Sequence, residues 1–466
     1  MSDGDPCRRK CSRRRFVRAT AVGAAVTLGV SQGAMGKPVD QSTGKVEVLP
    51  PRGRVPLSFF IDDSTCLVNM GHFCMPQFAE AWPTRAIYKK PWKTWPREIP
   101  DAFVREFGQW CADHGVKGKY SVVPYPCCVG WLDRELPGWS RKELLASLKL
   151  VRELMLPNWD IHPEMITHTR VIDLKTGRPF AEISSATMEN SYPRTKKSVD
   201  ELAAYLAYAL RILKNCELPC EGITTPGGFG NLVKSELSQA VGQAVRDVFA
   251  AEIPHYFKYV SGGKESTAPK LEHVQGAETD SPRLVVNVPA GTGDWFGNWD
   301  GDRTPEPDRY ANKDATAGRM VELIERGEPA VMLCHWPGMY TQGTKKGFAA
   351  FQQVVLALEG RFGDRTVWMK ISEIARYWAA KRLTRIEAEA GRVTFSAPFP
   401  CPSFTVAIRD VRAGGITLRR GRSVKALKDV KRASGLVAGT WMRREGGVVA
   451  CLDLPKGKSV LERTGS

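Results

Sequence analysis

Residues able to bind a metal or move a proton gather at the ends of several apolar segments of the chain. The groups are Asp62-Asp63, His162-Pro163-Glu164 with His168-Thr169, Thr225-Pro226-Gly227-Gly228, and His335-Trp336-Pro337. Active sites of β/α folds lie where the strands end, so we expect these groups to meet. A catalytic zinc ion needs about three protein ligands and an open position. Such an ion lowers the pKa of bound water, while a nearby carboxylate acts as base and an imidazole as acid.

The segments that must position these groups alternate between short apolar runs and helical patterns. We predict strands at 55–61, 118–124, 159–162, 222–225, 284–288, 330–334 and 367–370, and helices at 101–114, 140–156, 198–215, 234–250, 316–326, 348–361 and 371–381. Strands that alternate with helices predict β/α units around a parallel sheet or barrel. The fold class is therefore α/β, and about seven strands favour a distorted (β/α) barrel.

The pattern changes after Lys381, where helical periodicity stops and short alternating runs separated by Gly and Pro begin. This pattern predicts a small all-β, sandwich-like C-terminal domain. The predicted organisation is a signal peptide at 1–36, a linker at 37–54, the barrel at 55–382 and the sandwich at 383–466.

The N-terminus has the three parts of a secretory signal. Basic residues 12–18 (Ser-Arg-Arg-Arg-Phe-Val-Arg) precede the apolar run 19–30 and the small residues 34–36. The paired arginines followed by Phe16 favour the twin-arginine route. We therefore expect a periplasmic or secreted protein. Of the 12 cysteines, ten lie beyond this signal, and an even number in an oxidising compartment suggests disulfides, with Cys216/Cys220 and Cys401/Cys451 as local candidates.

The chain is basic, with a formal net charge of +17, and much of the excess is local. Residues 386–466 hold 15 Lys and Arg against 7 Asp and Glu. A basic surface can bind an anionic polymer, and export makes nucleic acid an unsuitable partner. No apolar stretch after the signal approaches membrane length, which predicts that the protein is not an integral membrane protein. We expect a polysaccharide or cell-wall glycan as partner, with an anionic glycan as one candidate.

Several motifs resemble those of the polysaccharide deacetylase (NodB-homology) superfamily and its glycoside hydrolase/deacetylase relatives, over roughly residues 55–380. Residues 59–64 are similar to its first motif, Thr-Phe-Asp-Asp-Gly, which implies Asp62 as catalytic base and Asp63 as metal ligand. Residues 331–335 resemble the last motif, which implies His335 as general acid.

Three motifs depart from the family pattern. In the first, Ser64 replaces the Gly after the paired aspartates. The second should read His-Ser/Thr-x-x-His, but here Ile172 replaces the second His after His168, so we take His162 as the substitute ligand. In the third, Thr225 stands where the family has an Arg that orients the catalytic Asp. Glu164 is open to three interpretations: metal ligand, base or solvated residue.

A loop dense in aromatic rings predicts a sugar-binding surface. Pyranose faces stack on aromatic rings, while carboxylates accept bonds from hydroxyl groups. The residues predicted to bind substrate are Thr225, Gly227, Asp294, Trp295, Trp299 and Trp336.

The leading hypothesis is an exported carbohydrate-active hydrolase that deacetylates a polysaccharide. Asp63, His162 and His168 would hold a divalent metal, with zinc as first choice, while Asp62 acts as base and His335 as acid. One alternative is a catalytically inactive glycan-binding protein on the same fold. Another is a metal-independent glycoside hydrolase that uses carboxylates such as Asp62 and Asp294.

Overall fold

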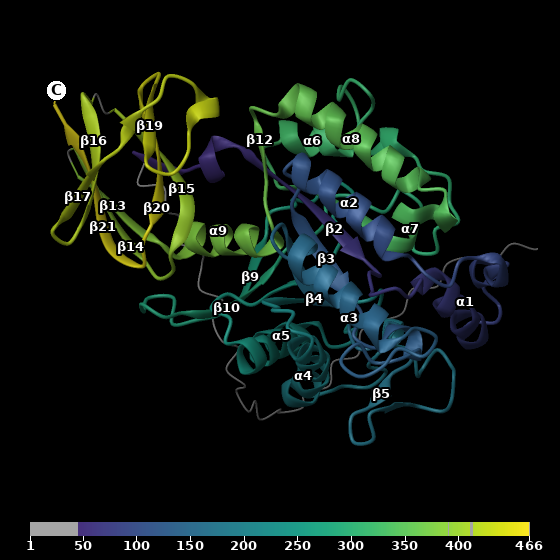
Figure 1. The fold of residues 1–466 in the computed structure, drawn as a ribbon. Coiled ribbons are helices and arrows are strands. Elements are labelled where there is room, and N and C mark those ends of the chain that lie inside the picture. Colours follow the sequence, from purple (N-terminus) through teal and green to yellow (C-terminus); the bar gives the residue numbers. More distant parts are fainter. Residues whose placement is uncertain (1–44, 390, 411–412, 466) are drawn as a thin grey trace, which may run out of the picture. The chain divides into compact units, whose positions relative to one another are not determined.

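The computed structural model describes residues 45–389, 391–410 and 413–465, and the predicted twin-arginine signal at 1–36 lies outside them (Figure 1). The helices are α1 Met70–Ala81, α2 Asp101–Asp113, α3 Arg141–Leu150, α4 Val199–Asn215, α5 Lys234–Phe249, α6 Arg319–Glu325, α7 Trp336–Tyr340, α8 Lys346–Phe362 and α9 Ile371–Leu383. The strands up to residue 368 are β1 Val46–Val48, β2 Val55–Asp62, β3 Gly118–Val122, β4 Trp159–Pro163, β5 Ile172–Asp173, β6 Arg178–Pro179, β7 Gly222–Thr224, β8 His255–Phe257, β9 Lys270–Gln275, β10 Arg283–Asn287, β11 Ala330–His335 and β12 Thr366–Trp368.

One parallel sheet holds most of the strand ends that the sequence singled out. Its order is β11-β2-β3-β4, with β12 also paired to β2. Every residue of β2 is buried, as expected for a parallel strand covered on both faces. The register of β11 and β2 places His335 opposite Asp62, at the carboxyl edge of the sheet. The backbone pairing therefore brings the predicted acid and base to the same level.

A second sheet has the order β7-β8-β10-β9, in which β9 is antiparallel and the other neighbours are parallel. An isolated parallel bridge between Glu164 and Thr224 joins the end of β4 to the end of β7. All seven strands predicted before residue 370 are present. The structure is thus a mixed α/β protein with two largely parallel sheets, and closure of these sheets into a barrel stays a prediction.

The helices begin where local chemistry favours them. Ser140 and Ser198 each cap a helix in a reciprocal capping box with the Glu three residues later, at the start of α3 and α4. The sequence pattern missed α1, which contains Pro76, and the short strand β8. A proline inside a helix and a three-residue strand both leave too little periodicity to recognise.

The nine strands after residue 384 form two five-stranded sheets together with β1, and a sandwich-like C-terminal domain stays a prediction. These strands are β13 Arg385–Glu389, β14 Arg392–Ala397, β15 Cys401–Arg409, β16 Gly415–Arg420, β17 Ser423–Ala426, β18 Lys428–Asp429, β19 Thr440–Arg444, β20 Gly447–Leu454 and β21 Gly457–Thr464. The sheet orders are β1-β15-β20-β19-β18 and β13-β14-β21-β16-β17.

The predicted linker at 37–54 needs correction, because β1 falls within it and pairs antiparallel with β15. Val46 and Val48 are buried and Glu47 is exposed, which is the two-residue alternation of a strand with one buried face. Among the described residues, no helix combines the length and apolar character needed to cross a membrane.

Candidate active site and metal site

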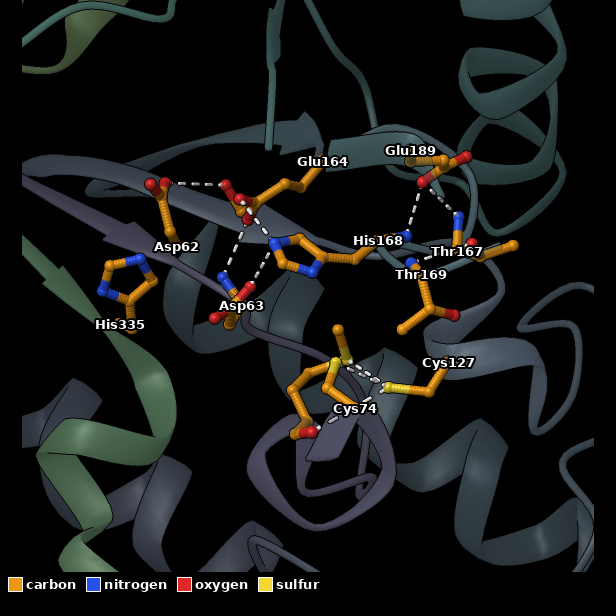
Figure 2. A network of polar contacts seen from close by, with 12 residues as sticks. Asp62, Asp63, Cys74, Cys127, Glu164, Thr167, His168, Thr169, Glu189 and His335 are labelled. Carbon is orange, nitrogen blue, oxygen red and sulfur yellow. Dashed lines mark hydrogen bonds and ion pairs between the residues drawn. The ribbon is translucent and has the colours of Figure 1, made fainter. Parts of the chain in front are cut away.

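Three buried side chains at the carboxyl edge of the first sheet form the strongest candidate for a metal site. Among the described residues, Asp63, Glu164 and His168 each offer a ligand atom, and these atoms all lie within 4.8 Å of one another. The Nε2 atom of His168 lies 2.8 Å from Asp63 Oδ1 and 3.5 Å from Glu164 Oε1 (Figure 2). Asp63 Oδ2 is buried and accepts no hydrogen bond. One imidazole and two carboxylates, with an unsatisfied buried oxygen, fit a divalent cation.

The backbone around the site supports this arrangement. Asp63 follows β2 with a φ of 58°, and its N–H donates to Glu164 Oε2 at 2.8 Å. His168 also has a positive φ, 64°. Such left-handed conformations are uncommon for residues other than glycine and often occur at functional sites. The two turns direct the side chains of Asp63 and His168 toward each other.

Glu189 holds the loop that carries His168. Its carboxylate accepts hydrogen bonds from the N–H groups of residues 166, 167 and 168, at 3.2, 3.1 and 2.6 Å, and from the Tyr205 hydroxyl at 2.6 Å. Burial raises the pKa of Glu189 to about 7, although the four donors oppose this shift. Sequence analysis missed Glu189, which lies in a polar loop with no motif to mark it.

Asp62 sits at the end of β2 beside a buried lysine. Lys119 Nζ donates to Asp62 Oδ1, and the Ser121 hydroxyl lies 3.4 Å from the same oxygen. Burial raises the pKa of Asp62, the Glu164 carboxylate raises it further, and Lys119 and His335 oppose both effects. Sequence analysis missed Lys119, although a lysine within an apolar strand was a visible signal.

His335 is oriented by Asp294. The carboxylate oxygen Oδ2 of Asp294 accepts hydrogen bonds from the His335 backbone N–H at 3.1 Å and contacts ring atom Nδ1 at 2.8 Å. Burial alone would lower the pKa of His335, but the bond to Asp294 and the charges of three nearby aspartates raise it to about 9. The His335 side chain is 23% exposed, whereas that of Asp63 is 1% exposed, so the imidazole is the more accessible to a substrate.

His162, predicted as a metal ligand, does not join the metal group. Its Nε2 lies 3.0 Å from His255 Nε2, and its Nδ1 lies 3.4 Å from the Thr224 hydroxyl. Burial lowers the pKa of His162 well below its ordinary value, so the ring is neutral. Glu164, two residues later and at the strand end, takes the place that the sequence analysis gave to His162.

The predicted substrate residues divide into accessible and buried ones. Trp295 and Trp299 are half-buried, and Gly227 is exposed. Trp336, which was also predicted to bind sugar, is 1% exposed and packs against Phe103, Phe107 and Tyr120 in the core. Thr225 is buried and its hydroxyl has no hydrogen-bond partner. Asp294 contacts His335, which gives it a positioning role.

A pair of buried thiols lies beside the metal group (Figure 2). The sulfur atoms of Cys74, on α1, and Cys127 are 3.2 Å apart, and Met70 Sδ lies 3.3 Å from Cys127. Burial raises the pKa of both thiols. All ten cysteines beyond the predicted signal are free thiols in the structure, including the local candidates Cys216/Cys220 and Cys401/Cys451.

No protein-family model and no curated protein matches the chain. Solved structures do match, at low identity. One is a probable polysaccharide deacetylase from Pseudomonas aeruginosa PAO1, 11% identical, which covers 71% of this chain and 94% of its own, with a TM-score of 0.37. Another is a presumed polysaccharide deacetylase from Mycobacterium smegmatis, 13% identical, covering 74% and 99%, with a TM-score of 0.38.

A third match is a presumed glycoside hydrolase/deacetylase from Parabacteroides distasonis, 10% identical, covering 82% of this chain and 86% of its own, with a TM-score of 0.41. At such TM-scores the likeness carries no conclusion about activity, which must come from the site itself. The solved structures that match also include an α-fucosidase from Thermotoga maritima, 11% identical, covering 89% of this chain and 97% of its own, with a TM-score of 0.30.

Proposed function

We propose that the protein is a metal-dependent hydrolase that removes acetyl groups from a polysaccharide. The observation that carries this proposal is the meeting of three functional groups at one sheet edge. The metal group Asp63, Glu164 and His168 lies beside the carboxylate Asp62, and His335 stands opposite Asp62 in the strand register. Metal-assisted hydrolysis of an ester or amide needs a base, an acid and a Lewis acid, and this edge offers a base, an acid and residues that could hold the metal.

The surroundings of each residue indicate its role in the reaction. A divalent ion held by Asp63, Glu164 and His168 would supply Lewis acidity toward an acyl carbonyl, and zinc is our first choice for this mixed nitrogen and oxygen ligand set. Asp62 accepts the proton of the attacking water. His335, whose raised pKa keeps it protonated at neutral pH, donates a proton to the leaving group.

A metal-independent glycosidase with Asp62 and Asp294 as its carboxylate pair fits the structure less well. Oδ2 of Asp294 is bound to His335, and Oδ1 accepts the N–H of Phe296 at 3.0 Å. Both oxygens of Asp294 are therefore already in use, and neither is free to act on a sugar ring.

The decisive experiment measures metal content by elemental mass spectrometry together with acetate release from acetylated chitooligosaccharides. We expect about one equivalent of divalent metal in the wild type, and loss of both metal and turnover in Asp63→Asn and Glu164→Gln. His162→Gln is the matched control, because it also changes a buried polar residue of the β4 end and should keep the metal. Metal binding without acetate release would instead favour the inactive glycan-binding alternative, and metal loss in His162→Gln alone would restore the ligand set predicted from sequence.

We also propose export by the twin-arginine route, on the basis of the sequence alone. Replacing Arg13 and Arg14 by lysine should leave the protein in the cytoplasm of a bacterial host, as judged by cell fractionation. Unchanged export of this variant would contradict the proposal.

A further inference from the structure

We propose that Lys119 is the positioning residue that fixes the catalytic carboxylate of Asp62. This inference rests on the proposed function and assigns a role to a residue that no sequence motif marks. Lys119 lies on β3, next to β2, and its side chain is fully buried. A lysine without solvent contact is rare unless its charge is paired.

The ammonium group has a full set of acceptors. A lysine ammonium can donate three hydrogen bonds and accept none. Lys119 Nζ donates to Asp62 Oδ1, to the Ser121 hydroxyl at 2.9 Å and to the Ile61 carbonyl oxygen at 3.1 Å. With all three donors used, the group has one preferred position.

Two aromatic rings further restrict that position. Nζ lies 5.7 Å from the centroid of the Phe60 ring and 5.1 Å from that of Phe257. Rings at this distance attract a cation, most strongly where water is excluded. In the strand register Lys119 is paired with Phe60, two residues before Asp62, so its long side chain runs toward the carboxyl edge of the sheet to reach the carboxylate.

The contact gives the two oxygens of Asp62 different environments. Lys119 and Ser121 both contact Oδ1, and the Asp62 carboxylate also faces that of Glu164 (Figure 2). The positive charge also offsets the repulsion that Asp62 experiences from Glu164. Thr225, which stands where the similar superfamily has an arginine, carries no charge, whereas Lys119 supplies one from a different strand.

The test compares Lys119→Met, which keeps most of the side-chain length but removes the charge, with Lys119→Arg, which keeps the charge. On acetylated chitooligosaccharides we expect kcat of Lys119→Met to fall roughly 100-fold, with KM within about twofold, because the residue acts through Asp62 and not on the substrate. Lys119→Arg should recover part of kcat. Zinc content and zinc affinity should not change, since Lys119 contacts none of the three ligands.

A double-variant cycle with Asp62→Asn adds a stability readout, which does not depend on turnover, to the comparison of kcat values. Lys119→Met alone leaves Asp62 buried without its cation, so the metal-free protein should be less stable to denaturant than the double variant Lys119→Met/Asp62→Asn. In the Asp62→Asn background, Lys119→Met should cause no further loss of kcat. If Lys119→Met fails to fold, the double variant and Lys119→Arg still report on the coupling.

The outcomes separate this inference from the proposed function. An active wild type with equally active Lys119→Met overturns the role of Lys119 and leaves the deacetylase proposal intact. A wild type that releases no acetate overturns both, while the stability cycle still measures the Lys119–Asp62 contact. If Lys119→Met and Asp62→Asn have additive effects on the free energy of unfolding, the Lys119–Asp62 contact has no coupling energy.

Discussion

At the scale of single residues, Asp294 determines the pH range over which His335 can serve as an acid. The raised pKa of His335, about 9, depends on Asp294, since burial by itself would lower it. A general acid works while it is protonated, so activity should persist through neutral pH and fall as pH rises through about 9. In Asp294→Asn the raising partner is lost, and the alkaline limb of kcat/KM should move roughly 1–2 pH units toward acid.

The measurement is a pH profile of kcat/KM on acetylated chitooligosaccharides for both proteins. Asp302→Asn is a suitable control, because it removes an exposed carboxylate from the neighbouring loop. An alkaline limb that stays in place in Asp294→Asn would exclude His335 as the group that titrates there.

The site shows which residues a sequence can and cannot predict. Asp62, Asp63 and His335 were predictable because each ends a buried strand. His162 contacts His255 and not the metal group. Two residues span about 6–7 Å along a strand, and this distance separates His162 from the sheet edge where Glu164 lies. Lys119 and His255 came from other strands, and their partners are visible only once the sheets are assembled.

At the scale of elements, the loop between β4 and β5 depends on Glu189. Replacing Glu189 by Gln substitutes an amide donor for an oxygen that accepts backbone N–H groups, so at least one buried donor loses its partner. We expect the free energy of unfolding to fall by about 1–3 kcal/mol. Because the same loop holds His168, we also expect metal affinity to fall about 10- to 100-fold.

Denaturant unfolding and metal titration of Glu189→Gln measure the two effects. Glu182→Gln, an exposed residue of the segment between β6 and α4 that also carries Glu189, is the control and should change neither. If stability falls while metal affinity does not, the loop would not be what positions His168.

A second element-scale feature is the contact between α1 and the short turn that holds Cys127. Cys74 and Cys127 are buried beside the metal group, with their sulfurs 3.2 Å apart. Replacing Cys74 by Ser introduces a hydroxyl into this apolar cluster at a cost of about 1–3 kcal/mol in the free energy of unfolding, whereas Cys74→Ala should cost less. Denaturant unfolding measures the stability of both variants. Equal free energies of unfolding would contradict this prediction, because they would show that water reaches the cluster and satisfies the hydroxyl.

At the scale of the whole molecule, the C-terminal sheets are tied to the α/β part. The Tyr377 hydroxyl, on α9, donates to the carbonyl of Leu49 at 2.6 Å and accepts the N–H of Thr405 at 3.2 Å. Truncating the chain after residue 385 would expose this buried contact and remove the partner strand of β1.

The alternating sequence pattern predicted strands in this region. The pairing of β1 with β15 joins residues far apart in sequence, so it could not be predicted from the local pattern. Because truncation would also disturb the Tyr377 contact, point variants are the better test of what the C-terminal sheets do.

Basic residues are concentrated in one segment of the chain, which contains an edge strand of each of the two C-terminal sheets. β17 is the edge of one C-terminal sheet and β18 the edge of the other. The segment 420–432 carries six exposed basic residues against one acid, Asp429: Arg420, Arg422, Lys425, Lys428, Lys431 and Arg432. Basic residues on an edge strand discourage edge-to-edge pairing, and in this number they also attract polyanions.

We predict that this basic edge, defined as Arg420–Arg432, strengthens binding to an anionic polysaccharide without taking part in catalysis. The triple variant Arg422→Glu/Lys425→Glu/Lys428→Glu should bind polygalacturonate at least tenfold more weakly at low salt and depend less on salt concentration, because screening acts on the lost charges. Turnover of a short neutral chitooligosaccharide should not change. A control with the same charge change, Lys264→Glu/Lys313→Glu/Arg361→Glu, separates a local surface from net charge. If both triple variants weaken binding equally, the attraction comes from the overall charge of +17 and not from the basic edge.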